Sequence, residues 1–378
     1  MQVKIVPVKP IKSELTKFIE FGIDFYKGNE YFVPPLVTDD LNTLLPDKNP
    51  AFDFCEAQSF MVYRDDKPVG RITGIINKAV NERTGEHTVR FGFIEFIDDD
   101  EVVDALICAV SQWGKERGMT EIEGPLGFTD LDHEGMLTFG YDEIGTMATI
   151  YNYDYYPRQM ERIGMQTSAE WVEYRIKIPE QIPDRIARVG DLVKRRFNLS
   201  FPELKSKKVL KEKYGHKLFN LINEAYDDLY GYSPLTPRQI DHYIDQYLGI
   251  LDLRDICVIV DKDDNLVGVG ISIPSFSKAL QKSGGKMLPF GWWHLLKALK
   301  LKNDVVDLLL VAIKKEYQSK GVNALLFTKL IPAYNAKGYK YAESNPELAE
   351  NSGVQSQWDY FEKRQHRRRA AFKKKIEK

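Results

Sequence analysis

The stretch Val305-Val-Asp-Leu-Leu-Leu-Val-Ala-Ile313 is an apolar run interrupted only by Asp307. β-Branched and leucine-rich runs of this length are typical of strands buried on both faces. A basic loop, residues 314–320, follows the run and leads to Gly321. The next segment places apolar residues at helical spacing, namely Leu325, Leu326, Leu330 and Ile331. The sequence therefore predicts a strand, a glycine-bearing loop and an amphipathic helix.

The junction between this strand and this helix has the properties of an anion-binding site. Glycine has no Cβ, and the first N–H groups of a helix have no partner within the helix. The loop matches neither G-x-x-x-x-G-K-[ST] nor G-x-G-x-x-G. We expect a phosphate or pyrophosphate near residues 318–324. The alternative is an ordinary strand–loop–helix corner with solvated lysines.

Gln318-Ser-Lys-Gly321-Val-Asn323 resembles the acyl-CoA-binding signature of the GNAT superfamily of N-acyltransferases, Gln/Arg-x-x-Gly-x-Gly/Ala after a strand. It departs from that signature at Asn323, where the family usually has glycine or alanine. The resemblance implies acetyl-CoA or another acyl-CoA as co-substrate, and no metal. The residues implied to hold it are Val311, Ala312, Ile313, Gln318, Ser319, Lys320, Gly321, Val322, Asn323, Ala324 and Asn351.

The same order of elements is found twice along the chain. Residues 61–76 and 257–273 each predict a hairpin with an Asp-rich turn and a second strand that begins with Val-Gly. Residues 110–125 and 330–346 each predict a helix closed by glycine, a short strand and a proline-bearing loop. Residues 155–165 resemble the short helix near the close of many GNAT domains.

We therefore predict an α/β (α+β) fold of two tandem GNAT-like domains, each a mixed central sheet flanked by helices. The predicted domains are residues 1–178 and 184–378. The alternative is a pair of unrelated α/β domains that share a common order of elements.

The two halves are not equivalent in charge. The acidic segment Asp98–Glu101 stands where the second half has the basic loop 314–320. Carboxylates at a helix N-terminus repel a pyrophosphate, so we predict that the first domain is a degenerate copy without CoA. Its aromatic run, residues 151–156, suggests Tyr153 and Tyr155 as acceptor-binding residues, and aromatic core packing is the alternative.

Amine acylation needs a polarised thioester, a deprotonated amine and a protonated leaving thiolate. The GNAT resemblance implies Asp307, eleven residues before Gln318, as the catalytic base. The alternative is that Asp307 simply begins its strand at an exposed end, and Glu343 is a second carboxylate for the role. The resemblance also implies Tyr360 as the acid, although Trp358 occupies the usual position of that tyrosine.

Composition sets the remaining expectations. The chain has 378 residues, 43% of them hydrophobic, and a net charge of -2, which suits a two-domain globular protein. Three scattered cysteines predict reduced, buried thiols in a cytoplasmic protein. The six histidines lack metal-ligand spacing, and neither a signal peptide nor a membrane-spanning run is expected.

Two further segments carry unusual composition. Residues 363–378 hold nine Lys/Arg and one acid, which predicts a solvated terminal helix or, alternatively, contact with nucleic acid or acidic lipid. Residues 276–301 form a long, aromatic connection between two strands. We expect an inserted helix that covers the domain interface there. A lid or substrate tunnel and an amphipathic membrane-surface helix are the alternatives.

The sequence thus predicts an acyl-CoA-dependent N-acyltransferase that transfers an acyl group, such as acetyl, to a small-molecule or peptide amine by direct attack in a ternary complex. One alternative is a Fem-type transferase, which uses two such domains and takes an aminoacyl group from tRNA. Another is a non-catalytic ligand-binding protein that retains the fold.

Overall fold

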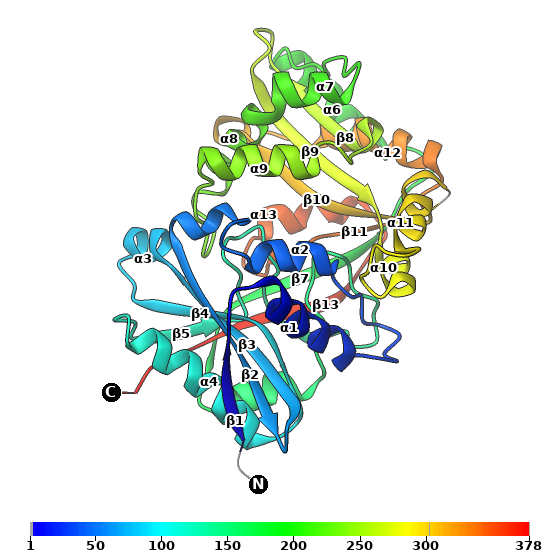
Figure 1. Ribbon diagram of the computed structural model, residues 1–378. Helices are drawn as coiled ribbons and strands as arrows, with labels where there is room; N and C mark the ends of the chain where they lie inside the picture. The colour runs from blue at the N-terminus through cyan, green and yellow to red at the C-terminus, as the bar shows by residue number, and fades with distance from the viewer. Residues whose placement is uncertain (1–2, 302, 378) are drawn as a thin grey trace. The chain divides into compact units, whose positions relative to one another are not determined.

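The computed structural model describes residues 3–301 and 303–377 (Figure 1). The chain forms two compact units. Unit 1 contains the residues up to Val172, together with Phe276–Lys297 and the residues from 367 onward. Unit 2 contains Glu173–Ser275 and Ala298–His366. These units differ from the predicted ranges 1–178 and 184–378, because two later segments of the chain belong to unit 1.

Unit 1 is built on a sheet whose strands run in the order β1-β2-β3-β4-β5-β13, with β6 paired to β13. Pairing is antiparallel except between β4 and β5, which are parallel. The bounds are β1 (Lys4–Val8), β2 (Cys55–Arg64), β3 (Lys67–Asn77), β4 (Thr88–Phe96), β5 (Glu121–Gly124), β6 (Met136–Phe139) and β13 (Lys363–Lys375).

The helices of unit 1 cover this sheet through two separate apolar clusters. Helix α4 (Asp100–Lys115) contributes Val102, Leu106 and Val110 to the larger cluster, spaced one turn apart. Helix α1 (Lys12–Phe25) contributes Leu15, Phe18 and Ile19 to the other. The remaining elements of unit 1 are α2 (Val37–Leu44), η1 (Pro50–Asp53), α3 (Lys78–Thr84), α5 (Tyr155–Arg162) and α10 (Ser277–Ser283).

Unit 2 is built on a sheet of order β7-β11-β10-β9-β8, with β12 paired to β7. Along the path from β7 to β8, β10 and β11 are parallel, whereas β11–β7, β10–β9 and β9–β8 are antiparallel. The bounds are β7 (Gln166–Lys177), β8 (Ile256–Val260), β9 (Leu266–Pro274), β10 (Val305–Ile313), β11 (Tyr341–Glu343) and β12 (Glu347–Leu348).

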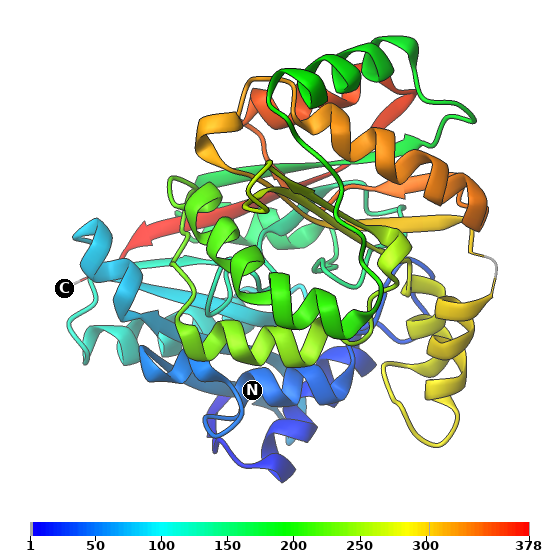
Figure 2. The ribbon, with the colours of Figure 1, turned by 90° about the horizontal axis from the view of Figure 1, so that it is seen from above.

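Figure 2 shows α6 (Asp184–Arg196) and α12 (Asn323–Lys337) on one face of the unit 2 sheet, and α8 (Gly215–Tyr226) and α9 (Pro237–Tyr247) on the other. The predicted stripe of α12 is confirmed, since Leu325, Leu326, Leu330 and Ile331 are all buried. The shorter elements are α7 (Lys207–Val209), η2 (Leu210–Tyr214), η3 (Leu253–Asp255), η4 (Lys315–Tyr317), α13 (Ser352–Gln355) and η5 (Ser356–Tyr360); α11 (Gly291–Lys300) runs from unit 1 into unit 2.

The repeated order of elements is present at the level of strand register. Thr88, Val89 and Arg90 of β4 pair in parallel with residues 121–123 of β5. Residues 305–307 of β10 pair in the same way with residues 341–343 of β11. In both units a hairpin precedes the parallel pair and a helix connects its strands. Arg90 therefore stands in unit 1 where Asp307 stands in unit 2.

The basic C-terminal segment is a strand, so the predicted solvated helix is wrong. Arg367 and Arg369 of β13 are buried. The Nη1 of Arg369 donates to the carbonyls of Gly135, at 3.3 Å, and Ile150, and that of Arg367 donates to the carbonyl of Ile144. Guanidinium groups can be buried when carbonyl oxygens accept their hydrogen bonds. The guanidinium groups of Arg367 and Arg369 thus bind backbone carbonyls inside unit 1 and do not face a ligand at the surface.

The three cysteines are free thiols, but only two of them are buried as expected. Burial raises the pKa of Cys55 to about 12. Cys108 is exposed on α4, which corrects the prediction for that residue.

Asp40 on α2 makes unit 1 sensitive to pH. Burial raises its pKa to about 7, against the attraction of Arg71. Because the folded-state pKa exceeds the ordinary value, the stability that comes from the protonated form is complete below about pH 4 and is lost as pH rises through about 7. We expect Asp40→Asn to gain up to about 4 kcal/mol relative to the parent protein between pH 4 and pH 8, because the pKa of Asp40 is raised from 3.8 to about 7.

Urea denaturation at several pH values checks this expectation. The exposed Asp47 is a matched control, because Asp47→Asn removes the same charge from the surface. Identical pH dependence in the Asp40 variant and the parent protein would contradict the role of Asp40.

Candidate functional site

Strand β10 has an open edge beyond Asp307. It pairs with β11 only through residues 305–307, since β11 ends at Glu343, while it continues along β9 to Ile313. A bulge interrupts its pairing with β9 between Leu308 and Leu310. Val311 is 39% exposed, which corrects the prediction of a strand buried on both faces. An open edge offers backbone N–H and C=O groups to an extended ligand.

Three side chains from different elements reach carbonyls of alternate β10 residues. Asn345 Nδ2 donates to the Leu309 carbonyl at 2.7 Å. Tyr226 Oη, from α8, donates to the Val311 carbonyl at 2.9 Å. Gln318 Nε2 donates to the Ile313 carbonyl at 2.9 Å. Alternate residues direct their backbone groups to the same edge of a strand. The edge is therefore polar along its whole length from Leu309 to Ile313.

The loop after β10 has the geometry of an anion cradle. Ser319 and Gly321 have positive φ angles of 56° and 81°. A Cβ on Gly321 would lie 2.9 Å from Cγ1 of Val189 on α6. Within the described part of the chain, no side chain caps α12, whose N-cap is Val322. The loop conformation thus favours glycine at position 321. The N–H groups of Ala324 and Leu325 donate to the carbonyls of Gly321 and Val322, each at 3.0 Å, so the first turn of α12 is closed by the backbone and not by a side chain.

The equivalent helix end in unit 1 is closed. The Asp99 carboxylate accepts from Val102 N at 3.2 Å and so caps α4. Arg64 holds that carboxylate with two hydrogen bonds, at 2.7 and 2.9 Å. Asp98 pairs with Arg158, and Asp100 with Arg162. This end of α4 already carries its own anions, so it suits a pyrophosphate far less than the end of α12.

The lysines of the loop are less available than their number suggests. Lys314 pairs with Glu316 at 2.6 Å, and Lys315 pairs with Asp228 at 2.7 Å. Lys320 lies over the ring of Phe197, 5.8 Å from its centroid. Phe197 directly follows α6 and contacts Tyr317 of the loop. The positive charge beside the loop therefore comes from Lys320 and from the C-terminal end of α6.

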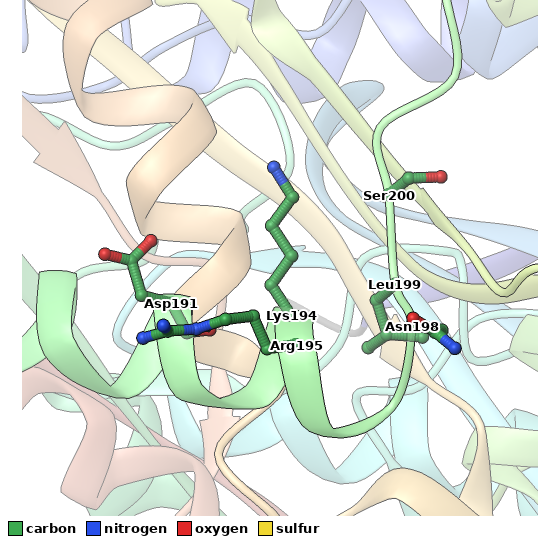
Figure 3. Close-up of a pocket in the computed structure, with 6 residues that line it drawn as sticks. All are labelled: Asp191, Lys194, Arg195, Asn198, Leu199 and Ser200. Carbon is green, nitrogen blue, oxygen red and sulfur yellow. The ribbon is translucent and has the colours of Figure 1, made fainter.

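A depression of about 630 Å³ adjoins this end of α6 (Figure 3). Figure 3 shows Lys194 and Arg195 projecting from the helix, and Asn198 on the segment after it. Its lining residues are Asp191, Lys194, Arg195, Asn198, Leu199 and Ser200. Two cations and several hydrogen-bonding groups give it the character of a phosphate-accepting surface.

Asp307 is buried beside a polar network and does not lie at an exposed strand end. Its register partner on β11 is Glu343, and both carboxylates are buried. Glu343 Oε1 lies 3.1 Å from Arg175 Nη1, and its Oε2 lies 2.9 Å from His366 Nε2. The guanidinium of Arg175 offsets the charge of Glu343. The network ends where β10 and β11 separate.

Glu347 on β12 is a candidate that sequence reasoning missed. Its Oε1 accepts from Trp358 Nε1 at 2.8 Å. Its Oε2 is buried, and no described residue gives it a hydrogen bond. Burial raises the pKa of Glu347 to about 7. No sequence motif indicates Glu347, because its raised pKa depends on burial that arises only in the folded chain.

The structure places the other predicted residues of unit 2 apart from this network. Tyr360 is exposed on η5, with the guanidinium of Arg185 5.0 Å from its ring centroid. Asn351 caps α13, because its Oδ1 accepts from Val354 N at 3.3 Å. Trp358 is buried and faces Glu347.

Tyr153 and Tyr155 belong to an aromatic cluster inside unit 1. Their rings stack at 5.8 Å, and Tyr153 also lies 5.8 Å from Phe25. Tyr155 Oη donates to the Phe96 carbonyl at 2.7 Å. These contacts favour the core-packing alternative for both residues.

Unit 1 has an acid–base cluster in the loop after β5 that sequence reasoning also missed. His133 Nε2 lies 2.9 Å from the Met147 carbonyl, and burial lowers the pKa of His133. Burial raises the pKa of Asp130 to about 6. It also raises the pKa of Glu134, helped by repulsion from Asp130. The loop therefore holds groups that favour their neutral forms.

Two curated proteins resemble the chain over most of their length. The chain is 26% identical over 324 residues to the bacterial ceramide synthase of Caulobacter vibrioides, covering 83% of this chain and 81% of that protein. It is 25% identical over 327 residues to Protein YghO of Escherichia coli, covering 85% and 82%. No protein-family model matches the chain.

Solved structures resemble the chain at the level of the fold. The tandem GNAT protein from the clavulanic acid biosynthesis pathway aligns over 100% of this chain and 99% of its own, with a TM-score of 0.57 and 10% identity. The glucosamine N-acetyltransferase region of a fungal multi-domain beta-N-acetylglucosaminidase aligns over 99% of this chain and 38% of its own, with a TM-score of 0.55 and 10% identity. The predicted tandem GNAT fold is confirmed.

Proposed function

We propose that this tandem GNAT-fold chain is an acyl-CoA-dependent N-acyltransferase that forms an amide on a long-chain amine. The open edge of β10 beyond Asp307 is the observation that carries the proposal. An extended pantetheine arm can pair with such an edge as a further strand would. The resemblance to a bacterial ceramide synthase favours a fatty acyl group and a sphingoid-base acceptor over acetyl transfer to a small or peptide amine.

The residues of unit 2 fit an acyl-CoA. Of the predicted residues Val311, Ala312 and Ile313, the first and third face the open edge of β10, so their N–H groups would hold the thioester arm, while the backbone groups of Ala312 face β9. The backbone from Gln318 to Ala324, at the N-terminal end of α12, would hold the pyrophosphate. Lys320 and the cations of the depression beside α6 would bind the other phosphate oxygens of the co-substrate. The bound co-substrate supplies an activated thioester carbonyl.

Amide formation then needs only proton transfers by the chain. The amine nitrogen attacks the thioester carbonyl carbon, the carbon–sulfur bond breaks, and the thiolate takes a proton. Asp307 is the proposed acceptor of the amine proton, directly or through water. Its register neighbour Glu343 lies 3.1 Å from Arg175 Nη1 and 2.9 Å from His366 Nε2. The pKa of a free thiol, about 8.5, makes protonation of the thiolate undemanding. Tyr360 is therefore not required for turnover.

Glu347 provides a second proton acceptor that a pH profile can distinguish. A base acts in its unprotonated form, so a group with a pKa of about 7 makes kcat/KM rise with pH through about 7. A rise in the parent protein that is lost in Glu347→Gln would assign the acceptor role to Glu347 in place of Asp307. The exposed Glu350→Gln serves as control. A rise that persists in Glu347→Gln would exclude Glu347 and leave Asp307 as the acceptor.

The proposal is tested by incubating the protein with palmitoyl-CoA and sphinganine, with mass spectrometry for the amide and a thiol reagent for released CoA. Calorimetric titration with palmitoyl-CoA and acetyl-CoA measures binding separately. Amide formation supports the proposal. Acyl-CoA binding without turnover of any amine would support a non-catalytic ligand-binding protein. Salt-sensitive tRNA binding without acyl-CoA binding would support the Fem-type alternative.

A further inference from the structure

Unit 1 exposes a cluster of large apolar side chains at one place on its surface. They lie between α10 and the first turn of α11, at residues 287–293, which we call the apolar tip. Their exposed fractions are Met287 38%, Leu288 78%, Phe290 72%, Trp292 45% and Trp293 46%. Scattered exposed apolar residues are normal, but five within seven positions mark an interaction site.

The fold presents the apolar tip on an ordered base. The Val37 N–H donates to the Gly285 carbonyl at 3.0 Å, and Lys286 Nζ pairs with Glu20 at 2.7 Å. The tip also closes on itself, because the Trp292 N–H donates to the Met287 carbonyl at 2.9 Å. The backbone of the tip is therefore held within unit 1, while its large side chains remain open to solvent.

Charge around the apolar tip identifies its partner. Residues 276–297 contain four lysines and no acid, in a chain whose net charge is -2. Lys286 is paired with Glu20, so the lysines that remain for a partner are Lys278, Lys282 and Lys297. Lys297 Nζ lies 4.9 Å from the ring centroid of Trp293. Tryptophan, phenylalanine and leucine beside lysines are the composition that binds anionic bilayer surfaces.

We propose that the apolar tip inserts into the interfacial layer of an anionic phospholipid membrane, with its lysines at the headgroups. Among residues 3–301 and 303–377, no helix has the length and apolarity to cross a bilayer. The proposed association is peripheral. It goes beyond the proposed function and does not depend on it, since it requires neither acyl-CoA nor an amine.

Tryptophan fluorescence reads this contact directly. The chain has five tryptophans, of which Trp113, Trp171 and Trp358 are buried, so Trp292 and Trp293 are the solvent-exposed reporters. Vesicles of phosphatidylglycerol and phosphatidylethanolamine should shift the emission to the blue, and brominated lipids should quench it. Vesicles of phosphatidylcholine alone should bind at least about tenfold more weakly, because they lack the negative surface potential.

Flotation with the same vesicles tests the side chains. Leu288→Glu combined with Phe290→Glu is expected to reduce the floating fraction at least tenfold. Phe139→Glu is the matched control, because Phe139 is a similarly exposed aromatic residue of unit 1 on β6. Undiminished flotation of the double variant, or an equal loss in the control, would overturn the proposal. The proposal would also be overturned if the tryptophan emission shifted to the blue without vesicles because the protein self-associates. Sedimentation velocity would detect that self-association.

Turnover with detergent-solubilised substrates separates this inference from the proposed function. The double variant should retain that turnover while losing flotation. Vesicle binding by a protein that turns over no amine would leave the membrane inference intact and remove the proposed activity.

Discussion

Asp307→Asn is expected to lower kcat by about 10²- to 10⁴-fold, the usual effect of removing a general base. The substitution keeps the size of the side chain but removes its ability to take a proton from the amine. Acyl-CoA affinity should stay nearly unchanged, since the proposed pyrophosphate and pantetheine contacts lie beyond Asp307 on β10 and its loop. Steady-state kinetics with palmitoyl-CoA and sphinganine, with calorimetry for binding, measure both effects.

Asp304→Asn is the matched control for this experiment. Asp304 is exposed and lies just before β10, so the same change of charge is made outside the buried network. The thermal midpoint of both variants shows whether the fold is preserved. Full turnover by a folded Asp307→Asn protein would exclude Asp307 and pass the role to Glu347 or Glu343.

Gly321→Glu is expected to weaken acyl-CoA binding at least about 100-fold. Three effects act together: a φ of 81° that L side chains rarely adopt, a Cβ within 2.9 Å of Val189, and a negative charge beside the phosphates. Calorimetric titration with palmitoyl-CoA measures the loss.

Two further variants separate charge from strain. Gly321→Ala adds a Cβ at the same positive φ but no charge. It should therefore bind acyl-CoA more tightly than Gly321→Glu does. Gly118 also has a φ of 81° but open space around its Cβ position, so Gly118→Glu strains unit 1 while leaving the loop intact. Unchanged acyl-CoA affinity in a folded Gly321→Glu protein would place the binding site elsewhere.

The predictions that succeeded rest on local patterns. Hydrophobic periodicity indicated β10 and α12, because the residues that decide it are neighbours along the chain. The duplicated hairpins were also readable, since each Asp-rich turn lies between its own two strands. Neither prediction depends on contacts with residues far along the chain.

The features that were missed depend on contacts far along the chain. Lys315 looked available for phosphate, but its partner Asp228 lies 87 residues away. The correspondence of Arg90 with Asp307 became visible only through strand register. Segment 363–375 was misread because buried arginines are rare, and the carbonyls that accept from them come from loops more than 200 residues earlier.

Because β13 pairs with strands from early in the chain, the sheet of unit 1 is completed late in translation. Residues 372–375 pair with β5, which is made about 250 residues earlier, and residues 368–370 pair with β6, which is made about 230 residues earlier. During translation, β5 therefore has one edge unpaired until residues 372–375 leave the exit tunnel. Exposed strand edges promote aggregation. A message truncated just before β13 would thus yield a nascent chain that is prone to aggregate, although the other strands are present.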